Sequence, residues 1–334
     1  MKKIFYFRSS FFNSFLGCLL ALLLGACKKD QELSTTDRPS VSQYIAGDPQ
    51  LSLWRTAFSR CHLDTDTSFS DGGPYTFFCP VDSAFIAAGL TADSIGRYNP
   101  DSLGSLLRYH ILSGKFSSQD IIGFVTANVS SLNPGFKPYI TKNYFGIFLD
   151  GIGVTEGDLE MGDGVIQKIS RVAFPPKQTV LQLIDSLPEL SYFAAVIDRV
   201  PNFKTLLSQF QPAHSDQPGS LPGLTVLVPT NAAFQASTLL PSLDAINQAD
   251  PNVLFSVMEF YFLNGFRFTS DFMGGYVPGH AQVEFGNGGS FKIDKDGITI
   301  IPDYPVGVPP RIVNSNQICT DGVVQEISEF FISD

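Results

Sequence analysis

A cysteine, a histidine and a second cysteine are the first residues whose types could do chemistry. Cys61 and His62 are adjacent, and Cys79 follows in the same part of the chain. Thiolates and imidazole bind zinc, but this spacing is not that of a zinc motif. A Cys61–Cys79 disulfide is the preferred alternative, because both residues fall in one repeat of the chain, and Cys319 is then left over. We therefore expect no metal site.

The usual catalytic motifs are missing from the sequence. It contains no Gly-x-Ser-x-Gly, His-Glu-x-x-His or P-loop. Asp294-Lys295-Asp296-Gly297 is similar to a calcium loop, but Lys292 takes the first ligand position, so the EF-hand pattern fails. Paired carboxylates for glycoside hydrolysis are assembled in space, and the sequence leaves them open. We expect a protein that is not an enzyme and has no cofactor, with a polysaccharide hydrolase as the remote alternative.

The N-terminus has the order of a targeting segment. Lys2, Lys3 and Arg8 precede an apolar stretch at 15–24, which is too short to favour a permanent membrane span. Leu-Gly-Ala-Cys at 24–27 follows it and resembles a bacterial lipobox. The resemblance implies a signal peptide, cleavage before Cys27 and lipidation of the Cys27 thiol; a plain signal peptide or a short anchor is the alternative.

Composition limits the remaining possibilities. The chain has 334 residues, of which 44% are apolar, enough for one large domain or two ordinary ones. Its net charge is −10, with no Lys/Arg run outside the first 29 residues. Because nucleic-acid binding needs a basic face, nucleic acid is not an expected partner.

Three blocks of sequence recur in the same order. The segment Y-T-F-F-C-P-V-D-S-A-F at 75–85 matches 224–234, L-L-R-Y-H-I-L-S-G-K-F-S-S-Q-D at 106–120 matches 257–271, and D-G-V-I-Q-K-I-S at 163–170 matches 321–328. The first and third blocks each predict a buried strand, and the second begins on a helix with one apolar face. A recurrence of this length predicts two copies of one domain.

The repeat divides the chain into four parts. Residues 1–26 form the predicted signal peptide, and 27–40 a polar, flexible tether. The first repeat spans 41–176 and the second 177–334, with the boundary near F-P-P-K at 174–177 because two prolines end the last strand of the first repeat. Each repeat reads as helix, strand, helices and then several strands.

These blocks resemble the fasciclin (FAS1) domain, in tandem, over nearly all of the chain after the signal peptide. Asp163 and Asp321 replace the usual Asn of the closing strand, and Tyr261 replaces the His of the second block. Lys28-Lys29-Asp30 also looks like the export signal of surface lipoproteins in Bacteroidetes. The resemblance implies an α+β fold, in which each domain is a β-sandwich wedge flanked by helices, and a role in adhesion or binding without catalysis.

The resemblance also points to candidate binding residues. Tyr109-His110 matches the family's Tyr-His motif, which is linked to cell adhesion. His110 lies on the apolar stripe of its helix and Tyr261 fills the same slot in the second repeat, so a hydrogen-bonded core role is the preferred alternative. Asp158 and Leu159 lie where the family carries an acidic ligand-binding motif, although a solvated turn explains them as well.

Three segments of the second repeat read as surface loops, at 211–223, 273–280 and 302–311. Tyr276, His280 and Tyr304 could form a binding lip there, because specificity tends to lie on loops held by a rigid scaffold. Plain loop punctuation is the alternative.

Together these features predict a cell-envelope lipoprotein of the outer membrane, exposed at the cell surface or facing the periplasm. Its two fasciclin-like domains would bind a protein or glycan ligand, from another cell, the matrix or the envelope. The alternative is an accessory structural subunit of an outer-membrane complex of the polysaccharide-uptake type.

Overall fold

The structure is a computed structural model. It describes residues 38–64, 73–121, 125–209, 223–273, 283–284, 290–294, 298–302 and 307–330. The chain divides into two units, Met1–Arg38 and Pro39–Asp334, and every element below belongs to the second. The predicted signal peptide, Cys27 and most of the tether lie outside the described residues.

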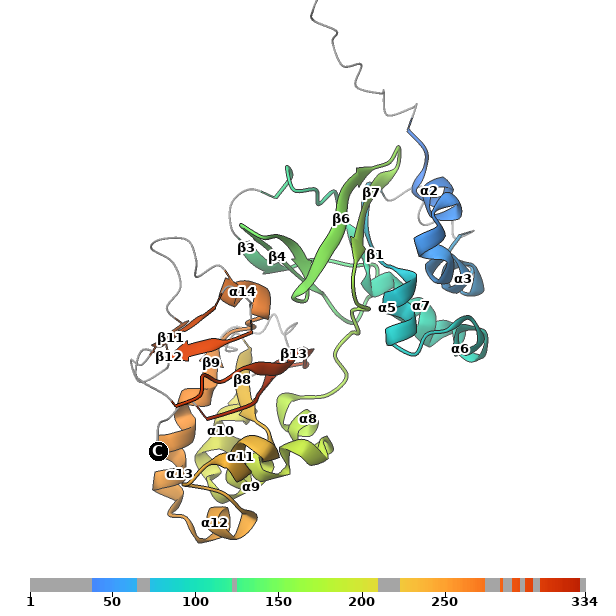
Figure 1. The fold of residues 1–334 in the computed structure, drawn as a ribbon. Coiled ribbons are helices and arrows are strands. Elements are labelled where there is room, and N and C mark those ends of the chain that lie inside the picture. The colour runs from blue at the N-terminus through green and yellow to red at the C-terminus, as the bar shows by residue number, and fades with distance from the viewer. Residues whose placement is uncertain are drawn as a thin grey trace, which may run out of the picture. The chain divides into compact units, whose positions relative to one another are not determined.

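The first repeat contains six described helical segments and seven strands (Figure 1). The helices are α2 (Val41–Gly47), the 3₁₀ helix η1 (Pro49–Leu51), α3 (Ser52–Arg60), α5 (Asp82–Ala87), α6 (Ala92–Arg97) and α7 (Pro100–Tyr109). The strands are β1 (Tyr75–Pro80), β2 (Ile111–Ser113), β3 (Val125–Asn128), β4 (Tyr139–Asn143), β5 (Gly146–Leu149), β6 (Ile152–Glu160) and β7 (Gly164–Ile169). They form one sheet in the order β2-β1-β7-β6-β5-β4-β3.

The recurrent first and third blocks of the sequence are the two central strands of this sheet. Strand β1 pairs in parallel with β7, from Tyr75 opposite Gly164 to Pro80 opposite Ile169, and every residue of both strands is buried. Burial on both faces explains why most residues of these strands are apolar, although Thr76, Gln167 and Lys168 are also buried there. The helices α2, α3, α5 and α7 cover one face, where Trp54 and Phe85 pack, while β4 and β5 curl over the other (Figure 1).

The second repeat has the same plan. Its helical segments are α8 (Val180–Ser186), η2 (Pro188–Leu190), α9 (Ser191–Arg199), α10 (Pro201–Gln209), α11 (Asn231–Ala236), α12 (Leu243–Gln248), α13 (Pro251–Met258), η3 (Glu259–Tyr261) and α14 (Thr269–Met273). Its strands are β8 (Leu224–Pro229), β9 (Phe262–Asn264), β10 (Val283–Glu284), β11 (Ser290–Ile293), β12 (Ile300–Pro302), β13 (Ile312–Ile318) and β14 (Gly322–Ile327). Strands β8 and β14 pair in parallel as β1 and β7 do.

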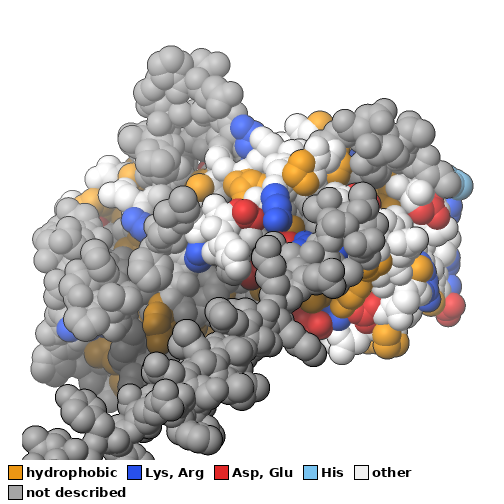
Figure 2. Space-filling view, turned by 90° about the horizontal axis from the view of Figure 1, so that it is seen from above, with side chains coloured by type: hydrophobic (Ala, Val, Ile, Leu, Met, Phe, Trp, Pro, Cys, Tyr) orange, Lys and Arg blue, Asp and Glu red, His pale blue; other side chains and the backbone are white. Residues whose placement is uncertain are grey.

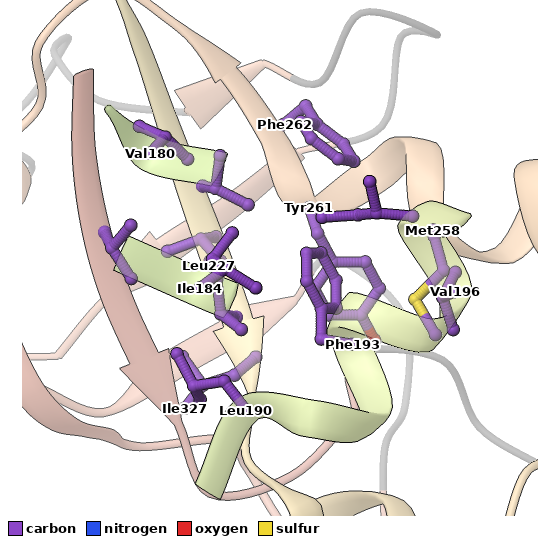
Figure 3. Packing of buried hydrophobic residues seen from close by; sticks show 14 of the residues in the cluster. Val180, Ile184, Leu190, Phe193, Val196, Leu227, Met258, Tyr261, Phe262 and Ile327 are labelled. Atoms are coloured by element: carbon purple, nitrogen blue, oxygen red, sulfur yellow. The ribbon is translucent and has the colours of Figure 1, made fainter. Parts of the chain in front are cut away.

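The main hydrophobic core of the second repeat lies between its helices and its sheet. Figure 3 shows side chains from α8, α9 and α13 meeting those of β8 and β14. Phe193, Tyr261 and Leu227 are fully buried there. In the described part of the chain no helix alone is long and apolar enough to cross a membrane; 180–186 and 188–199 meet that test only as a pair bent by 104°.

The same hydrogen bonds recur in both repeats. Asp163 accepts from the amide of Val41 (2.7 Å), and Asp321 accepts from the amide of Val180 (2.8 Å). Each carboxylate therefore holds the first residue of a helix against the turn before the closing strand. This bond needs an acceptor, which explains why Asp can stand where the family usually has Asn.

One helix start differs between the repeats. Thr230 is the N-cap of α11, and its side chain accepts from the amide of Ala233. Helix α5 has no side-chain cap at its start, and Asp82 instead accepts from the amide of Leu53 (2.8 Å). Asn231 accepts from Tyr192 in the same way (2.9 Å), so this position of both repeats joins two helices.

A left-handed glycine follows the same short strand in each repeat. Gly114 and Gly265 have φ of 116° and 84°. Strands β2 and β9 separate the preceding helical segment from each glycine. The left-handed residue therefore turns the chain away from the sheet edge rather than ending the helix.

Residues of the two repeats contact one another around β4 and α14. The Tyr139 ring stacks on Phe266 with centroids 4.8 Å apart. Asn143 Nδ2 donates to the carbonyl of Ser270 (2.6 Å), and Asn316 Nδ2 donates to that of Gly151 (3.3 Å).

Candidate functional site

Tyr109 lies in the core rather than at the surface. It is the last residue of α7, its side chain is fully buried, and its hydroxyl donates to Asp150 Oδ2 at 2.8 Å. Burial and the neighbouring carboxylate raise the pKa of Tyr109. Its side chain cannot meet a ligand at the surface of the folded domain, which corrects the prediction of direct contact.

His110 has two buried hydrogen-bond partners. Its Nε2 accepts from the amide of Ala173 (3.0 Å), so the ring proton is on Nδ1, which donates to the carbonyl of Leu106 (2.9 Å). The ring also lies edge-on to Trp54, 5.8 Å between centroids. Burial lowers the pKa of His110 to about 4. The core role is therefore the one that the structure shows, and surface contact through His110 is corrected.

Tyr261 takes the place of His110 in the second repeat and is also fully buried. Its ring packs edge-on against Phe330, 6.0 Å between centroids. Like Tyr109 and His110, it cannot contact a surface ligand directly.

Asp150 is the buried carboxylate that Tyr109 holds. It lies in the turn between β5 and β6 at a φ of 48°, and its side chain accepts from the Tyr109 hydroxyl and from the amide of Tyr139 (2.8 Å). Burial raises the pKa of Asp150 to about 7. A carboxylate in this turn thus titrates close to neutral pH.

Asp150 lines a pocket of about 380 Å³ together with the segment that joins the two repeats. The lining residues are Asp150, Ile152, Arg171–Gln178, Leu183 and Asn316–Cys319. The segment 171–178 buries Val172, Ala173 and Pro176 and exposes Arg171, Phe174, Lys177 and Gln178. We call 171–178 the junction segment and this cavity the junction pocket.

The buried Tyr-His pair supports this pocket from behind. Tyr109 fixes Asp150, and His110 fixes the junction segment through the amide of Ala173. Two adjacent residues at the end of α7 therefore hold two separate parts of the pocket wall. The motif acts on the pocket as an internal brace, not as its contact surface.

Asp158 also has a structural role. It has a φ of 57° in an irregularity of β6, where its amide donates to Gln167 Oε1 (2.9 Å) and its carboxylate accepts from the amide of Ser118 (2.8 Å). Hydrogen bonding to Ser118 and Gln167 lowers the pKa of Asp158, against the opposing effect of burial. Leu159 is half-buried against the first-repeat core.

The second repeat builds the same irregularity with Asn316. Its φ is 61°, its amide donates to Gln325 Oε1 (2.7 Å), and its side chain accepts from the amide of Thr269 (2.8 Å). Because a neutral Asn does the work of Asp158, the geometry does not require the negative charge. Ligand contact through Asp158 and Leu159 remains a prediction.

The loop residues stay outside this description. Tyr276, His280 and Tyr304 are not among the described residues. On the face seen in Figure 2, Lys and Arg side chains stand apart from one another, with Asp and Glu nearby.

Cys61, Cys79 and Cys319 are free thiols, so the predicted Cys61–Cys79 disulfide is wrong. Cys79 is fully buried in β1, and burial raises the pKa of its thiol, while Cys61 donates to the carbonyl of Pro100 (3.4 Å). Cys319 is also buried. Among the described residues no group of three or more His, Cys, Asp or Glu side chains is arranged to hold a metal ion.

A second pocket, of about 450 Å³, lies in the first repeat and has two carboxylates in its lining, Asp64 and Asp163. Asp163 is the helix-holding residue whose counterpart Asp321 makes the same bond. Its position is therefore explained by the fold, and nothing in this pair favours hydrolysis.

Sequence reasoning missed the residues of the junction pocket. Asp150 was not singled out by any motif, and Arg171, Phe174 and Lys177 stand at or beside the boundary between the repeats. The boundary itself carried a signal for a binding site. It holds two cations and an aromatic residue beside two prolines, and a simple linker does not require cations or an aromatic residue.

Comparisons with known proteins agree with the repeat. Residues 49–175 and 189–333 each match the family model of the fasciclin domain. Protein sll1483 of Synechocystis is 27% identical over 157 residues, which are 43% of this chain and 85% of that protein. Human stabilin-1 is 26% identical over 152 residues, 44% of this chain but 5% of stabilin-1.

Among solved structures, a FAS1 domain pair from the insect cell adhesion molecule fasciclin I covers 83% of this chain and 96% of its own, at 17% identity and a TM-score of 0.41. The two family matches take in most of the sequence, one in each repeat. The chain therefore belongs to the fasciclin family and carries two tandem FAS1 domains of mixed helix and strand.

Proposed function

We propose that this chain is a non-catalytic binding module of the cell envelope, anchored by a lipid on Cys27. Fasciclin domains are generally adhesion or binding modules without catalysis. The observation that carries the proposal is the junction pocket, whose wall has one carboxylate and two cations but no paired acids and no thiol–imidazole pair among its lining residues. Such a wall suits ligand binding better than bond cleavage.

A binding screen tests the function. The full-length chain, purified in mild detergent, is applied to an array of glycans and matrix proteins. Saturable binding to one class supports a binding module. A silent array, together with a stoichiometric partner that co-purifies from native membranes, would replace it with the accessory-subunit role.

The lipid anchor has its own test, because Cys18 and Cys27 are matched thiols in the N-terminal segment. Cells are grown with an alkyne fatty acid, and the protein is examined for label. Cys27→Ser should abolish labelling and release the protein from membranes, while Cys18→Ser should leave both unchanged. Equal labelling of both variants would exclude acylation at Cys27.

A further inference from the structure

The junction pocket carries positive charge that its own wall does not neutralise. No described residue forms an ion pair or hydrogen bond with Arg171, whose side chain is exposed. Lys177 lines the same wall and is also exposed. Two exposed cations on one pocket wall, without an acidic partner among the described residues, favour a bound anion.

The one carboxylate among the lining residues does not serve as this partner. Asp150 is buried, and its oxygens accept from the Tyr109 hydroxyl and the Tyr139 amide. The carboxylate therefore faces hydrogen-bond donors of its own domain. Within the part of the chain that the structure describes, neither Arg171 nor Lys177 has an acidic partner, so both can face a ligand.

The same wall offers an apolar surface and an amide. The Phe174 side chain is 42% exposed, between the two cations along the junction segment. Gln178 is exposed, and its backbone carbonyl accepts from the amide of Thr320 (2.9 Å), which fixes that end of the segment. An aromatic face with a nearby amide suits a ring that carries hydroxyl groups.

We propose that the junction pocket binds a carboxylated sugar, a uronic acid residue, through Arg171, Lys177 and Phe174. The inference rests on the binding function proposed above and names the ligand class for it. A guanidinium binds both oxygens of a carboxylate at once, and Lys177 adds a second positive charge. A pocket of about 380 Å³ has the size of a small-molecule site.

The junction segment is held in place before any ligand binds. The Ala173 amide is tied to His110, and Pro175 and Pro176 restrict the backbone beside Phe174. The segment therefore loses little conformational entropy when a ligand binds, and this favours affinity.

Titration calorimetry and ligand-detected NMR with the full-length chain test the proposal with three probes. D-glucuronate is the carboxylated sugar, D-glucose is its neutral counterpart, and inorganic phosphate is an anion without a ring. We expect saturable binding of glucuronate, at least tenfold weaker binding of glucose, and weakening with added salt. Phosphate binding as tight as that of glucuronate would reduce the site to an anion site and overturn the sugar assignment.

Single variants separate the contributions. Arg171→Ala should weaken glucuronate binding at least tenfold, and Arg171→Lys should restore it only in part, because a lysine lacks the two-pronged guanidinium. Phe174→Ala should weaken glucuronate but not phosphate. Lys115→Ala is the control, since Lys115 pairs with Glu160 (2.9 Å) and does not line the pocket; it should bind like the parent.

The outcomes distinguish this inference from the function on which it rests. If glucuronate does not bind but the array finds another ligand, the sugar assignment fails and the binding module stands. Unchanged binding in Arg171→Ala would place the ligand elsewhere and overturn the inference even if glucuronate binds. If neither the array nor glucuronate gives binding, both proposals fail.

Discussion

Asp150 and His110 are ionisable groups whose burial opposes their charged forms. Both support the junction pocket: Tyr109 donates to Asp150, and the next residue, His110, accepts from the amide of Ala173. The pKa of Asp150 rises to about 7 and that of His110 falls to about 4. Between pH 4 and pH 7, the contribution of Asp150 to the free energy of unfolding falls as pH rises, while that of His110 rises. The two pH dependences therefore partly cancel in the parent protein.

Asp150→Asn should remove the contribution of Asp150 to the pH dependence of stability. Because the folded pKa is above the ordinary value of 3.8, the stability from protonated Asp150 is complete below pH 4 and is lost as pH rises through 7. The Asn variant stays neutral. It should therefore gain on the order of 2–4 kcal/mol relative to the parent between pH 4 and pH 8.

Urea unfolding at a series of pH values, followed by the fluorescence of Trp54, measures this gain. Trp54 is the one tryptophan of the chain and is buried in the first repeat. Asp93→Asn, an exposed carboxylate on α6, is the control and should follow the parent. Parallel curves for the parent and Asp150→Asn would show that Asp150 does not titrate as described.

His110 should then dominate at acid pH. Its folded pKa is below the ordinary 6.5, so the stability it provides is present above pH 6.5 and is lost as pH falls through 4, when a protonated ring can no longer accept from Ala173. In the Asp150→Asn background, stability should fall by on the order of 2–3 kcal/mol between these values. Adding His110→Gln should flatten the slope; a slope that persists would belong to another group.

At the scale of the elements, the two repeats share their hydrogen-bond devices more closely than their residues. Thr76 and Thr225 each donate to the carbonyl of a glycine, Gly114 (2.8 Å) or Gly265 (2.7 Å). Gln167 and Gln325 each hold the left-handed residue of the neighbouring strand. The same side chains thus hold equivalent backbone groups beside the strands in both domains.

Replacing either buried glutamine should lower the free energy of unfolding. Gln167 and Gln325 are fully buried, and their amide groups also donate to the carbonyls of Phe116 (3.0 Å) and Arg267 (3.1 Å). Either Gln→Ala change removes the buried side-chain partner of one backbone amide and one backbone carbonyl, and should cost about 1–3 kcal/mol in total. Unfolding in urea should show this loss, and amide exchange should accelerate at Asp158 or Asn316, whereas the exposed Gln235→Ala should change stability by less than about 0.5 kcal/mol. A neutral Gln167→Ala would mean that water replaces these bonds.

The sequence was sufficient for the elements that repeat. Strands β1, β7, β8 and β14 are buried on both faces and were predicted as buried strands from the recurrent first and third blocks. Pro80 and Pro229 are the last residues of β1 and β8, where a proline is tolerated. These features depend on residues close together in the chain.

The junction pocket could not be read in the same way. It joins Asp150 to Arg171 and to Asn316, which are brought together by folding alone. The Cys61–Cys79 prediction failed for a related reason, since Cys79 lies inside a central strand and Cys61 lies at the end of α3, against Pro100. Sharing one repeat does not bring two side chains into contact.

At the scale of the whole molecule, the main cores belong to one repeat each. The cluster around Phe193 contains second-repeat residues, and the cluster around Trp54 contains first-repeat residues. A smaller cluster of Phe266, Phe268 and Val323 also receives Tyr139 from the first repeat. Because the main cores are separate and the shared contact is small, we expect each repeat to unfold as its own cooperative unit.

Phe193→Ala and Phe85→Ala test this separation. Each removes a buried ring and should cost about 3–5 kcal/mol. Phe85 lies edge-on to Trp54 (6.2 Å), so Phe85→Ala should lower the transition seen by Trp54, while Phe193→Ala should lower a calorimetric transition that Trp54 does not report. Equal shifts of the Trp54 signal in both variants would mean that the repeats unfold as one unit.

The junction segment has a consequence for how such a protein arises. Residues 171–178 follow the closing strand of one domain and precede the first helix of the next, and the pocket takes its remaining wall from Asn316–Cys319 of the second copy. A single fasciclin domain could keep the brace of Tyr109 and His110 but would have no opposite wall. Gene duplication would therefore have supplied a site that neither copy holds alone, and selection could then act on Arg171 and Lys177 without disturbing either core.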